Sequence, residues 1–441
     1  MSAAGAVYAH LWSTPETRAL FSDEGRTRAW LDVIAALAAA QAELGVIPAA
    51  AADQLAAVEA VDLDAVAEQT RATGHSTLGL IRVLREQLGP EGAEWLYHGA
   101  TVQDVTDTWF GLVAARALAI ADRDLAAIEA TLERLVAEHR DTVMLGRTHG
   151  QPGVPITFGF KAGVWLDELR RHRERLAQAR PRLEVGQLAG AVGTLSAWGE
   201  HGLELQRRVM ARLGLGVPGM SWVSARDRVA ELTGLLAMVA ATLAKVGNEV
   251  YNLQRPELGE LSEAPSEGVV GSITMPQKRN PERSEHLGTL ARLARAGAGL
   301  ALEGMVSEHE RDGAAWKTEW EVVPQVVGAA ATALALAREL LDGLRVHADR
   351  MRANVDAQDG YVLAEPAMLA LSAAVGKHRA HELVHRAALA GLQAGVGLAE
   401  ALGADPEIAR HLSPAELAAL LVPERALGAA GALVDDLLAG R

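Results

Sequence analysis

The stretch LTGLLAMVAATLAKVGNEVYNL, residues 232–253, decides the fold class. Its large apolar residues form two series that each repeat every seven positions: Leu232, Val239, Val246 and Leu253, and then Leu236, Leu243 and Val250. Because the spacings alternate between three and four residues, both series fall on one face of an α-helix, as in the seam of a coiled coil. Pro256 ends the pattern, since proline cannot continue a helix. The stretch therefore predicts a long helix that packs against other long helices.

The same helical spacing recurs over most of the chain, and strand signals are almost absent. Leucines repeat every seven residues at Leu118, Leu125 and Leu132. Further long helical patterns cover three ranges: 158–180, 284–305 and 324–345. These patterns predict an all-α protein. Apolar stripes of this kind are buried either within one chain or against further copies of it, and the spacing leaves both arrangements open.

The composition excludes several classes of protein. The formal net charge of −14 argues against a nucleic-acid-binding surface, which needs clustered Lys and Arg. The chain has no cysteine, which excludes disulfides, thiolate metal sites and thiol nucleophiles. The N-terminus lacks the basic and then apolar pattern of a signal peptide, and no uncharged apolar stretch approaches the roughly 20 residues that cross a bilayer. We therefore expect a cytoplasmic protein that binds neither nucleic acid nor a membrane.

Polar, glycine-rich segments interrupt the helical patterns at five places: 97–108, 144–159, 186–199, 262–281 and 307–320. Loops on a rigid scaffold often carry binding and catalysis. The segment 262–281 is too long and too rich in Gly and Pro for a simple connection between helices. It is expected to be a lid or binding loop with Gly268 and Gly271 as hinges, and an idle loop is the alternative.

The end of that segment, GSITMPQKRNP at 271–281, combines a hydroxyl, an ammonium and an amide within nine residues. Lys278 and Asn280 together can hold a carboxylate by charge and hydrogen bonding. Ser272 becomes a base only where N–H groups and cations stabilise its alkoxide, and a glycine-rich turn can supply such groups. The combination suits removal of a proton next to a carboxylate.

This motif resembles the GSSxMPxKxNP loop of the fumarase/aspartase superfamily, whose first serine is the catalytic base. Three other segments are similar to conserved regions of that superfamily, in the same order: YHGATVQDVTDT at 97–108, GRTHGQPGVPITFGFK at 146–161 and QLAGAVGTLSAWG at 187–199. Both ends of the chain also fit, so the resemblance covers nearly the whole chain. Ordered matches of this kind are far more specific than one short motif.

The resemblance implies a long central helical bundle flanked by two smaller helical domains. We expect an N-terminal domain at 1–105, the bundle with the catalytic loop at 106–350, and a C-terminal domain at 351–441. The resemblance also implies a homotetramer in which several subunits build each active site. It implies no metal and no organic cofactor, because the electron sink is the carboxylate of the substrate itself.

The resemblance assigns roles to individual residues. Ser272 is expected to be the base, and His149 in RTHGQP the acid that helps the leaving group depart; an unperturbed pKa near 6.5 suits a histidine to that task. The expected substrate-binding residues are Lys278, Asn280, Thr101, Gln103, Thr148, His75 and Arg311. Asp104 and Asp107 are expected to cap or brace a helix start rather than to perform chemistry.

Departures from the superfamily pattern narrow the reaction. Ile273 replaces the usual second serine, and Gln277 stands where adenylosuccinate lyases and carboxymuconate cycloisomerases have histidine. Trp316 and Trp320 replace the Ser and Arg that adenylosuccinate lyases use on the nucleotide phosphate, which disfavours a nucleotide substrate. The tryptophans resemble the 3-carboxy-cis,cis-muconate cycloisomerase branch, which also contains lyases of small substituted succinates.

We therefore expect a lyase that acts on a small dicarboxylate or tricarboxylate. The first expectation is elimination from a substituted succinate, which gives fumarate and an amine, nitro or similar leaving group. The alternative is a 3-carboxy-cis,cis-muconate cycloisomerase, and adenylosuccinate cleavage is disfavoured. A non-catalytic helical scaffold would also explain the apolar stripes, since a fold by itself does not imply activity.

A competing motif, H-E-x-x-H, lies at His381, Glu382 and His385. On a helix it places two imidazoles on one face, as in zinc hydrolases. Downstream, His411 is isolated, and no clear third ligand follows. The surrounding segment GKHRAHELVHR resembles the ordinary C-terminal helix of the superfamily, so the zinc hydrolase is a remote alternative.

Overall fold

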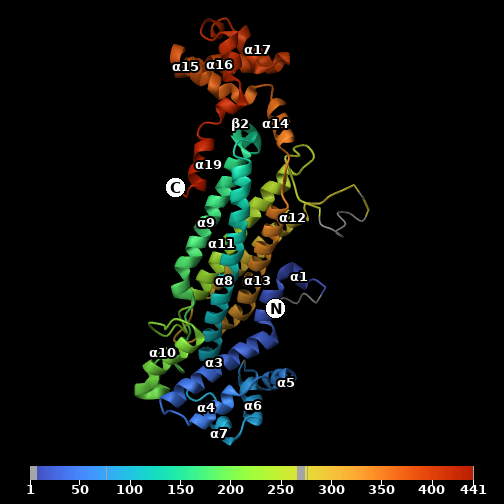
Figure 1. Cartoon of the computed structure of the whole chain (residues 1–441). Helices are drawn as coiled ribbons and strands as arrows, with labels where there is room; N and C mark the ends of the chain where they lie inside the picture. Colours follow the sequence, from blue (N-terminus) through green and yellow to red (C-terminus); the bar gives the residue numbers. More distant parts are fainter. Residues whose placement is uncertain (1–6, 76, 266–273, 276, 441) are drawn as a thin grey trace. The chain divides into compact units, whose positions relative to one another are not determined.

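The computed structural model describes residues 7–75, 77–265, 274–275 and 277–440 (Figure 1). Helices dominate, and the described strands form two small two-stranded sheets, so the all-α prediction is confirmed. The chain divides into two compact units. Unit 1 comprises 1–125, 172–244 and 287–336, and unit 2 comprises 126–171, 245–286 and 337–441. Each unit consists of three separate segments, whereas the three expected regions at 1–105, 106–350 and 351–441 are continuous. The three regions stay a prediction.

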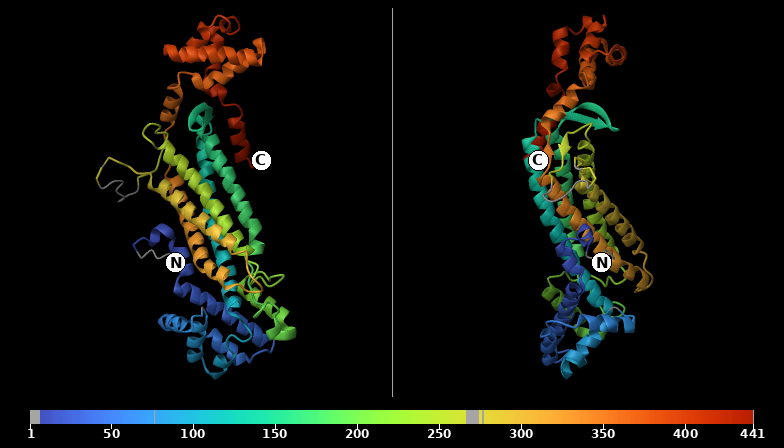
Figure 2. Two further views of the ribbon diagram at one scale, coloured as in Figure 1. Left: turned by 180° about the vertical axis from the view of Figure 1, so that it is seen from behind. Right: turned by 90° about the vertical axis from the view of Figure 1, so that its right-hand side faces the viewer.

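Five long helices form the scaffold: α8 (Val102–Glu138), α9 (Phe158–Leu183), α11 (Asp227–Leu253), α12 (Glu282–Glu303) and α13 (Gly313–Asp342). Segments of these helices lie side by side in both views of Figure 2. Helices α9, α11 and α12 follow the predicted patterns closely, whereas α8 begins at Val102, inside the expected polar segment 97–108. For α13 the prediction was wrong at the start, because residues 313–320 were expected to be a polar loop; Pro324 lies inside the helix rather than before it.

The predicted apolar stripes are buried. All seven residues of the two series in 232–253 are at most 2% exposed, and Leu118, Leu125 and Leu132 are fully buried. The chain itself therefore covers these stripes, which is the internal arrangement that the spacing had left open. The homotetramer stays a prediction, because burial of these stripes does not depend on it.

Two of the long helices, α11 and α13, are long and apolar enough to cross a membrane by length and composition alone. In their most apolar stretches, 61% of the α11 residues and 67% of the α13 residues are buried inside the protein. Packing within the chain therefore accounts for much of their apolar character. The expected absence of membrane binding stays a prediction.

The remainder of unit 1 consists of shorter helices: α1 (Ala9–Trp12), α2 (Pro15–Phe21), α3 (Asp23–Glu43), α4 (Ala49–Ala56), α5 (Leu63–Thr73), α6 (Leu78–Gln87), α7 (Pro90–Trp95) and α10 (Gly202–Leu213), with the 3₁₀ turn Ser196–His201. Helix α3 begins where the Ser22 hydroxyl accepts a 3.0 Å hydrogen bond from the Gly25 N–H, which satisfies a donor of the first turn. Its inner face packs Ile34 against Leu80 and Leu84 in an apolar core.

Unit 2 contains all the described strands: β1 (Val143–Thr148), β2 (Gln151–Thr157), β3 (Leu261–Ser262) and β4 (Arg345–Val346). Its shorter helices are α14 (Ala348–Asp356), α15 (Ala364–Val375), α16 (Lys377–Ala394), α17 (Leu398–Ala404), α18 (Pro414–Leu420) and α19 (Ala430–Leu438), with 3₁₀ turns at Tyr361–Leu363, Ile408–Arg410 and Pro423–Ala426. Strands β1 and β2 pair as an antiparallel hairpin. The expected polar loop at 144–159 is therefore wrong, since most of it is this hairpin.

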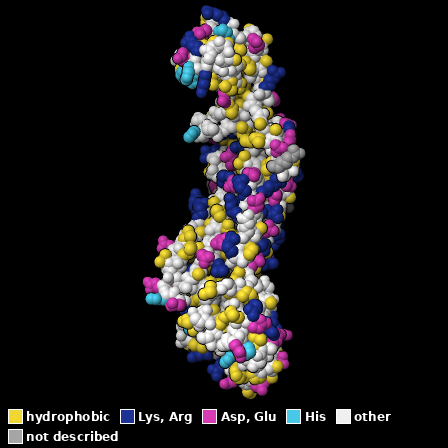
Figure 3. All heavy atoms as spheres, turned by 90° about the vertical axis from the view of Figure 1, so that its left-hand side faces the viewer, with side chains coloured by type: hydrophobic (Ala, Val, Ile, Leu, Met, Phe, Trp, Pro, Cys, Tyr) yellow, Lys and Arg dark blue, Asp and Glu magenta, His cyan; other side chains and the backbone are white. Residues whose placement is uncertain are grey.

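The described surface carries charges of both signs. On the face shown in Figure 3, Lys and Arg side chains are interspersed with Asp and Glu over the middle of the view. Within unit 2, for example, Arg170 pairs with Glu129 at 2.8 Å and with Glu133 at 2.5 Å. Arg170 and Glu129 are partly buried, so solvent screens this pair less than a fully exposed one.

Candidate active site

The start of α8 brings together residues that the sequence predicted to bind substrate. The guanidinium of Arg311 donates one hydrogen bond to Thr101 Oγ1 and another to the carbonyl of Ala191, both at 3.0 Å. The Nε–H of Arg311 is buried and has no partner within the described ranges. The Oε1 atom of Gln103 is also buried and has no hydrogen-bond partner among the described residues. The Nε2 atom of Gln103 donates a hydrogen bond to Asp107 Oδ2 at 3.2 Å. Unit 1 thus holds a polar cluster with unused hydrogen-bonding capacity.

Asp104 holds this helix start in place. Its carboxylate accepts 2.8 Å hydrogen bonds from the N–H groups of Thr101 and Ala189, and a longer one from Gly190. Burial raises the pKa of Asp104 to about 6, although the three backbone N–H groups act in the opposite direction. The expectation that Asp104 braces a helix start is confirmed. Through these hydrogen bonds, Asp104 links the segment around 189–190 to Thr101, the residue that contacts Arg311.

Asp107 belongs to a buried ion cluster that the sequence did not reveal. Arg226 donates two hydrogen bonds to Asp107, at 2.9 and 3.2 Å. It donates two more to Glu319, one of them 2.8 Å long. Burial raises the pKa of both carboxyls, with Arg226 opposing the rise. Burial alone would lower the pKa of Arg226, but the two carboxylates more than offset it and raise it. The cluster joins α8, the start of α11 and α13 within unit 1.

Thr148 and His149 lie at the tip of the β1–β2 hairpin. Thr148 pairs with Gln151, so His149 and Gly150 form a two-residue turn. Both residues have positive φ, 52° for His149 and 76° for Gly150, which is the backbone that a type I′ hairpin turn requires. A non-glycine residue rarely adopts this conformation. The hairpin therefore presents the His149 side chain at an exposed tip.

An ion pair fixes the base of this hairpin. Arg147 donates to both carboxylate oxygens of Glu260, at 2.9 and 2.6 Å, and the Glu260 side chain is fully buried. The Asn354 side chain donates a third hydrogen bond to Glu260 at 2.8 Å. A paired, hydrogen-bonded carboxylate of this kind is costly to disrupt. Sequence reasoning missed Glu260 and Asn354, because both lie more than 90 positions from the hairpin.

The expected catalytic loop is only partly described. Ser272, Gly268 and Gly271 lie outside the described residues, and so does most of the expected lid. Lys278 is exposed, and its N–H donates to the carbonyl of Met275 at 2.9 Å. Asn280 is half-buried just before α12. In unit 1, His75 is exposed directly after α5, next to Gly74, which ends that helix with a φ of 63°.

The predicted site residues thus fall into two groups. His75, Thr101, Gln103 and Arg311 belong to unit 1; Thr148, His149, Lys278 and Asn280 belong to unit 2. Among them, the structure gives a direct contact between Thr101 and Arg311.

The H-E-x-x-H motif lies on α16, where the rings of His381 and His385 stack with centroids 6.0 Å apart. Glu382 forms an ion pair with Arg379 at 3.0 Å. Among the described residues, no group of three His, Asp or Glu side chains could hold a metal ion. Ala380, Leu383 and Val384 of the same helix pack into an apolar core, so the helix has a structural role.

Two known families match most of the chain: the lyase family over residues 12–294 and the adenylosuccinate lyase C-terminus over residues 360–437. The chain belongs to the fumarase/aspartase superfamily of lyases. An N-acetyl-S-(2-succino)cysteine lyase of Dickeya dadantii is 39% identical over 430 residues, which are 97% of this chain and 94% of that protein. A 3-carboxy-cis,cis-muconate cycloisomerase of Pseudomonas aeruginosa is 39% identical over 428 residues, 96% of this chain and 93% of that one.

Solved structures agree with this assignment. This lyase is similar to the crystal structure of a fumarate lyase from Mesorhizobium sp. BNC1, with a TM-score of 0.91, 36% identity and coverage of 98% of this chain and 99% of that one. The predicted fold and superfamily are therefore confirmed. As a lyase of this superfamily the chain is an enzyme, and the inert scaffold and the zinc hydrolase are set aside.

Proposed function

We propose that this lyase removes a group from a small substituted succinate and releases fumarate. The observation that carries the proposal is the half-buried side chain of Arg311, whose buried Nε–H has no partner in the described part of the chain. Arginine and carboxylate form charge-assisted hydrogen bonds of matching geometry, so a buried N–H of this kind favours a carboxylate ligand. Members of the superfamily act on small dicarboxylates, which supports the same substrate class.

The proposed reaction begins with Ser272, which takes a proton from the carbon beside one carboxylate. The electron pair moves into that carboxylate, where Lys278 and Asn280 stabilise the added negative charge. The pair then forms the carbon–carbon double bond of fumarate as the bond to the leaving group breaks. His149 donates a proton to the departing atom. Because the carboxylate is the electron sink, the proposal needs no metal and no organic cofactor.

The remaining predicted residues would hold the substrate. We assign the second carboxylate to Arg311 with Thr101 and Gln103, and we assign Thr148 to the first carboxylate beside His149. His75 would lie at the edge of the same pocket. In line with the superfamily, whose members are oligomeric, the working form is proposed to be a cytoplasmic homotetramer with shared active sites.

Two relatives favour different reactions. The similarity to an N-acetyl-S-(2-succino)cysteine lyase supports elimination from a substituted succinate. The equal identity to a 3-carboxy-cis,cis-muconate cycloisomerase keeps ring closure as the second candidate. Adenylosuccinate cleavage is disfavoured because Trp316 and Trp320 offer no charged group to a phosphate.

An ultraviolet assay for fumarate across a panel of substituted succinates tests the proposal. Aspartate, nitrosuccinate, adenylosuccinate and thioether-substituted succinates should be run beside 3-carboxymuconate. We expect fumarate from at least one small succinate. Consumption of 3-carboxymuconate, with no fumarate from any succinate, would replace the proposal with the cycloisomerase.

A further inference from the structure

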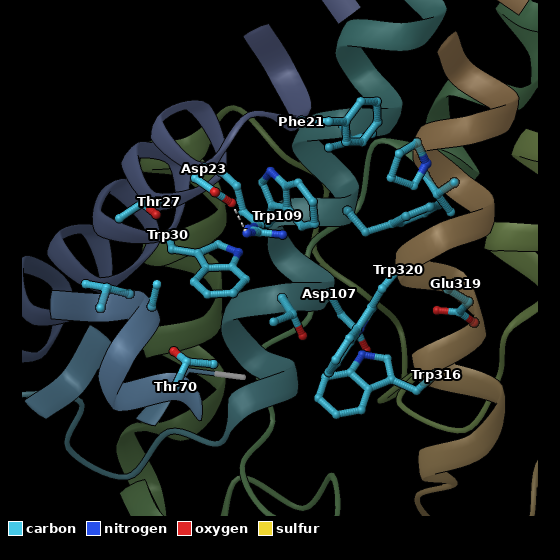
Figure 4. A pocket seen from close by; sticks show the side chains of 18 of the residues that line it. Phe21, Asp23, Thr27, Trp30, Thr70, Asp107, Trp109, Trp316, Glu319 and Trp320 are labelled. Carbon is cyan, nitrogen blue, oxygen red and sulfur yellow. Dashed lines mark hydrogen bonds and ion pairs between the residues drawn. The ribbon is translucent and has the colours of Figure 1, made fainter. Parts of the chain in front are cut away.

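A cavity of about 400 Å³ lies within unit 1, between helices α3, α5, α8 and α13 (Figure 4). Four tryptophans line it: Trp30, Trp109, Trp316 and Trp320. The whole chain has nine tryptophans, so nearly half of them gather at this one cavity. A volume of this size lies in the range of pockets for small organic molecules. Its aromatic walls favour an occupant with an apolar body.

Two indole N–H groups at this cavity have no hydrogen-bond partner in the part of the chain that the structure describes. Trp30 is 8% exposed, and its Nε1 is buried without a hydrogen bond to any described residue. The Nε1 of Trp109 is likewise buried and makes no such hydrogen bond. Figure 4 shows the Trp30 ring with its nitrogen on the side that faces the other labelled side chains. A buried donor without a partner costs free energy. An occupant that carries an acceptor oxygen would satisfy the Trp30 donor.

The charges around the cavity point to the same chemistry. Asp107 and Glu319 are both paired with Arg226, and Asp23 is paired with Arg26 at 2.5 Å. Arg71 also lines the cavity, and no ion pair of its side chain occurs among the described residues. With Arg226 included, three carboxylates and three guanidiniums lie at the cavity, so their charges balance. Because Arg71 has no ion pair among the described residues, its N–H groups can donate to an amide or carboxylate oxygen.

One hydrogen bond links the lining of the cavity to the proposed substrate-binding cluster. Asp107, which lines the cavity, accepts a 3.2 Å hydrogen bond from Gln103, one of the residues assigned to a substrate carboxylate. Trp316 follows Arg311 by five positions in the chain. Gln103 and Asp107 thus lie one turn apart on α8, between the residues assigned to the carboxylate and the lining of the cavity.

We propose that this cavity holds the departing half of the substrate, and that this half is an organic group with an apolar body and an amide or carboxylate oxygen. The proposal rests on the proposed function, and it narrows the substrate class. Ammonia or nitrite would leave most of the volume unfilled, so aspartate and nitrosuccinate should be poor substrates. Trp30 acts as a specificity residue that donates to the acceptor oxygen of the leaving group.

The test compares two thioether-substituted succinates. One carries an N-acetylcysteine group, and the other a butyl group of similar length that lacks an acceptor oxygen. Trp30→Phe keeps an aromatic ring and removes the N–H. It should raise KM for the N-acetylcysteine compound about five- to tenfold, the effect of losing one hydrogen bond, and change KM for the butyl compound less than twofold. An equal change for both compounds, or no change for either, would overturn the assignment.

The matched control is Trp165→Phe. Trp165 is buried on α9 outside the cavity, where its ring packs against Phe158 with centroids 6.1 Å apart. This variant removes an indole from another core and should leave the ratio of the two KM values at its wild-type level. A ratio that shifts as it does in Trp30→Phe would mean that general loosening, and not the lost donor, causes the effect.

A binding measurement separates this proposal from the proposed function. N-acetyl-S-methylcysteine cannot react, and its binding should quench tryptophan fluorescence at the cavity. We expect Trp30→Phe to weaken this binding five- to tenfold. If no succinate yields fumarate but this binding holds, the proposed function fails and the cavity assignment stands. If fumarate forms while N-acetyl-S-methylcysteine fails to bind, the cavity assignment fails alone.

Discussion

Arg311 and Thr101 are joined by a 3.0 Å hydrogen bond although 210 positions separate them in the chain. The contact places the half-buried guanidinium of Arg311 at the start of α8. Thr101 and Arg311 come from two different segments that resemble conserved parts of the superfamily. Their contact is the most direct link between the sequence motifs and a carboxylate-binding site.

Replacement of Arg311 tests that site. Arg311→Lys keeps the positive charge but loses the forked N–H geometry. We expect kcat/KM for the best succinate to fall about 10- to 100-fold, the value of a hydrogen bond to a charged group, with a clear rise in KM. Steady-state kinetics measure this, and circular dichroism checks the fold. An unchanged KM would show that Arg311 does not contact the substrate.

The Arg226 cluster makes a prediction about stability. Arg226→Met leaves Asp107 and Glu319 buried without their cation, which should lower the free energy of unfolding by about 3–5 kcal/mol. Adding Asp107→Asn and Glu319→Gln removes the uncompensated charges, so the triple variant should be more stable than Arg226→Met alone. Urea unfolding followed by circular dichroism measures both. A triple variant less stable than the single one would mean that hydrogen bonding, rather than charge, dominates the cluster.

The raised pKa of Asp104 predicts a pH dependence. Its pKa is about 6 in the folded chain and about 3.9 in an unfolded one, so the folded state binds the proton more tightly. The stabilisation from this group is complete below the unfolded value and is lost as the pH rises through 6. Between pH 5 and pH 7 the wild type should therefore lose about 1 kcal/mol relative to Asp104→Asn, which does not titrate.

Urea unfolding of both proteins at the two pH values measures this difference. The pH-independent cost of the substitution cancels, because only the change between the two pH values is compared. A difference that stays constant, or that grows in favour of the wild type at pH 7, would show that the three backbone N–H groups keep Asp104 ionised despite its burial.

The proposed acid makes a prediction about leaving groups. His149→Asn suits the turn, because asparagine tolerates a positive φ, but it cannot transfer a proton. Substrates whose leaving group needs a proton should slow about 100-fold or more, whereas nitrosuccinate, which releases nitrite without protonation, should slow far less. Comparison of kcat for the two kinds of substrate gives the answer. Equal losses would reduce His149 to a positioning residue.

The fold was predictable because its main signal is periodic. The stripe from Leu232 to Leu253 has helical spacing, and all of its large apolar residues are buried. The hairpin at 143–157 was not predicted. Its tip reads Thr-His-Gly-Gln rather than the Asn-Gly that marks two-residue turns, and its strands do not alternate clearly between polar and apolar residues.

The site was predictable only where a motif carried it. Thr101 and Arg311 came from motifs, and their contact supports both assignments. Arg226 and Glu319 carry no motif, and with Asp107 they meet from three distant positions, so no local pattern could have revealed their cluster. Trp316 and Trp320 were visible as a departure from the adenylosuccinate lyase pattern. Trp30 and Trp109 belong to no motif, and nothing in the sequence indicated that their N–H groups would lack partners among the described residues.

The sharpest prediction concerns Ser272, the proposed base. Ser272→Ala removes only the hydroxyl that would take the proton, so folding and assembly should be unchanged. Turnover should fall at least 10²–10⁴-fold, the usual effect of losing a general base, while the substrate still binds through Lys278, Asn280 and Arg311. Stopped assays for fumarate and calorimetric binding of the unreacted succinate measure the two effects separately. Ser272→Thr is the matched control, because it keeps a hydroxyl and should retain more turnover than alanine. Near-normal turnover in Ser272→Ala would assign the proton transfer to another residue.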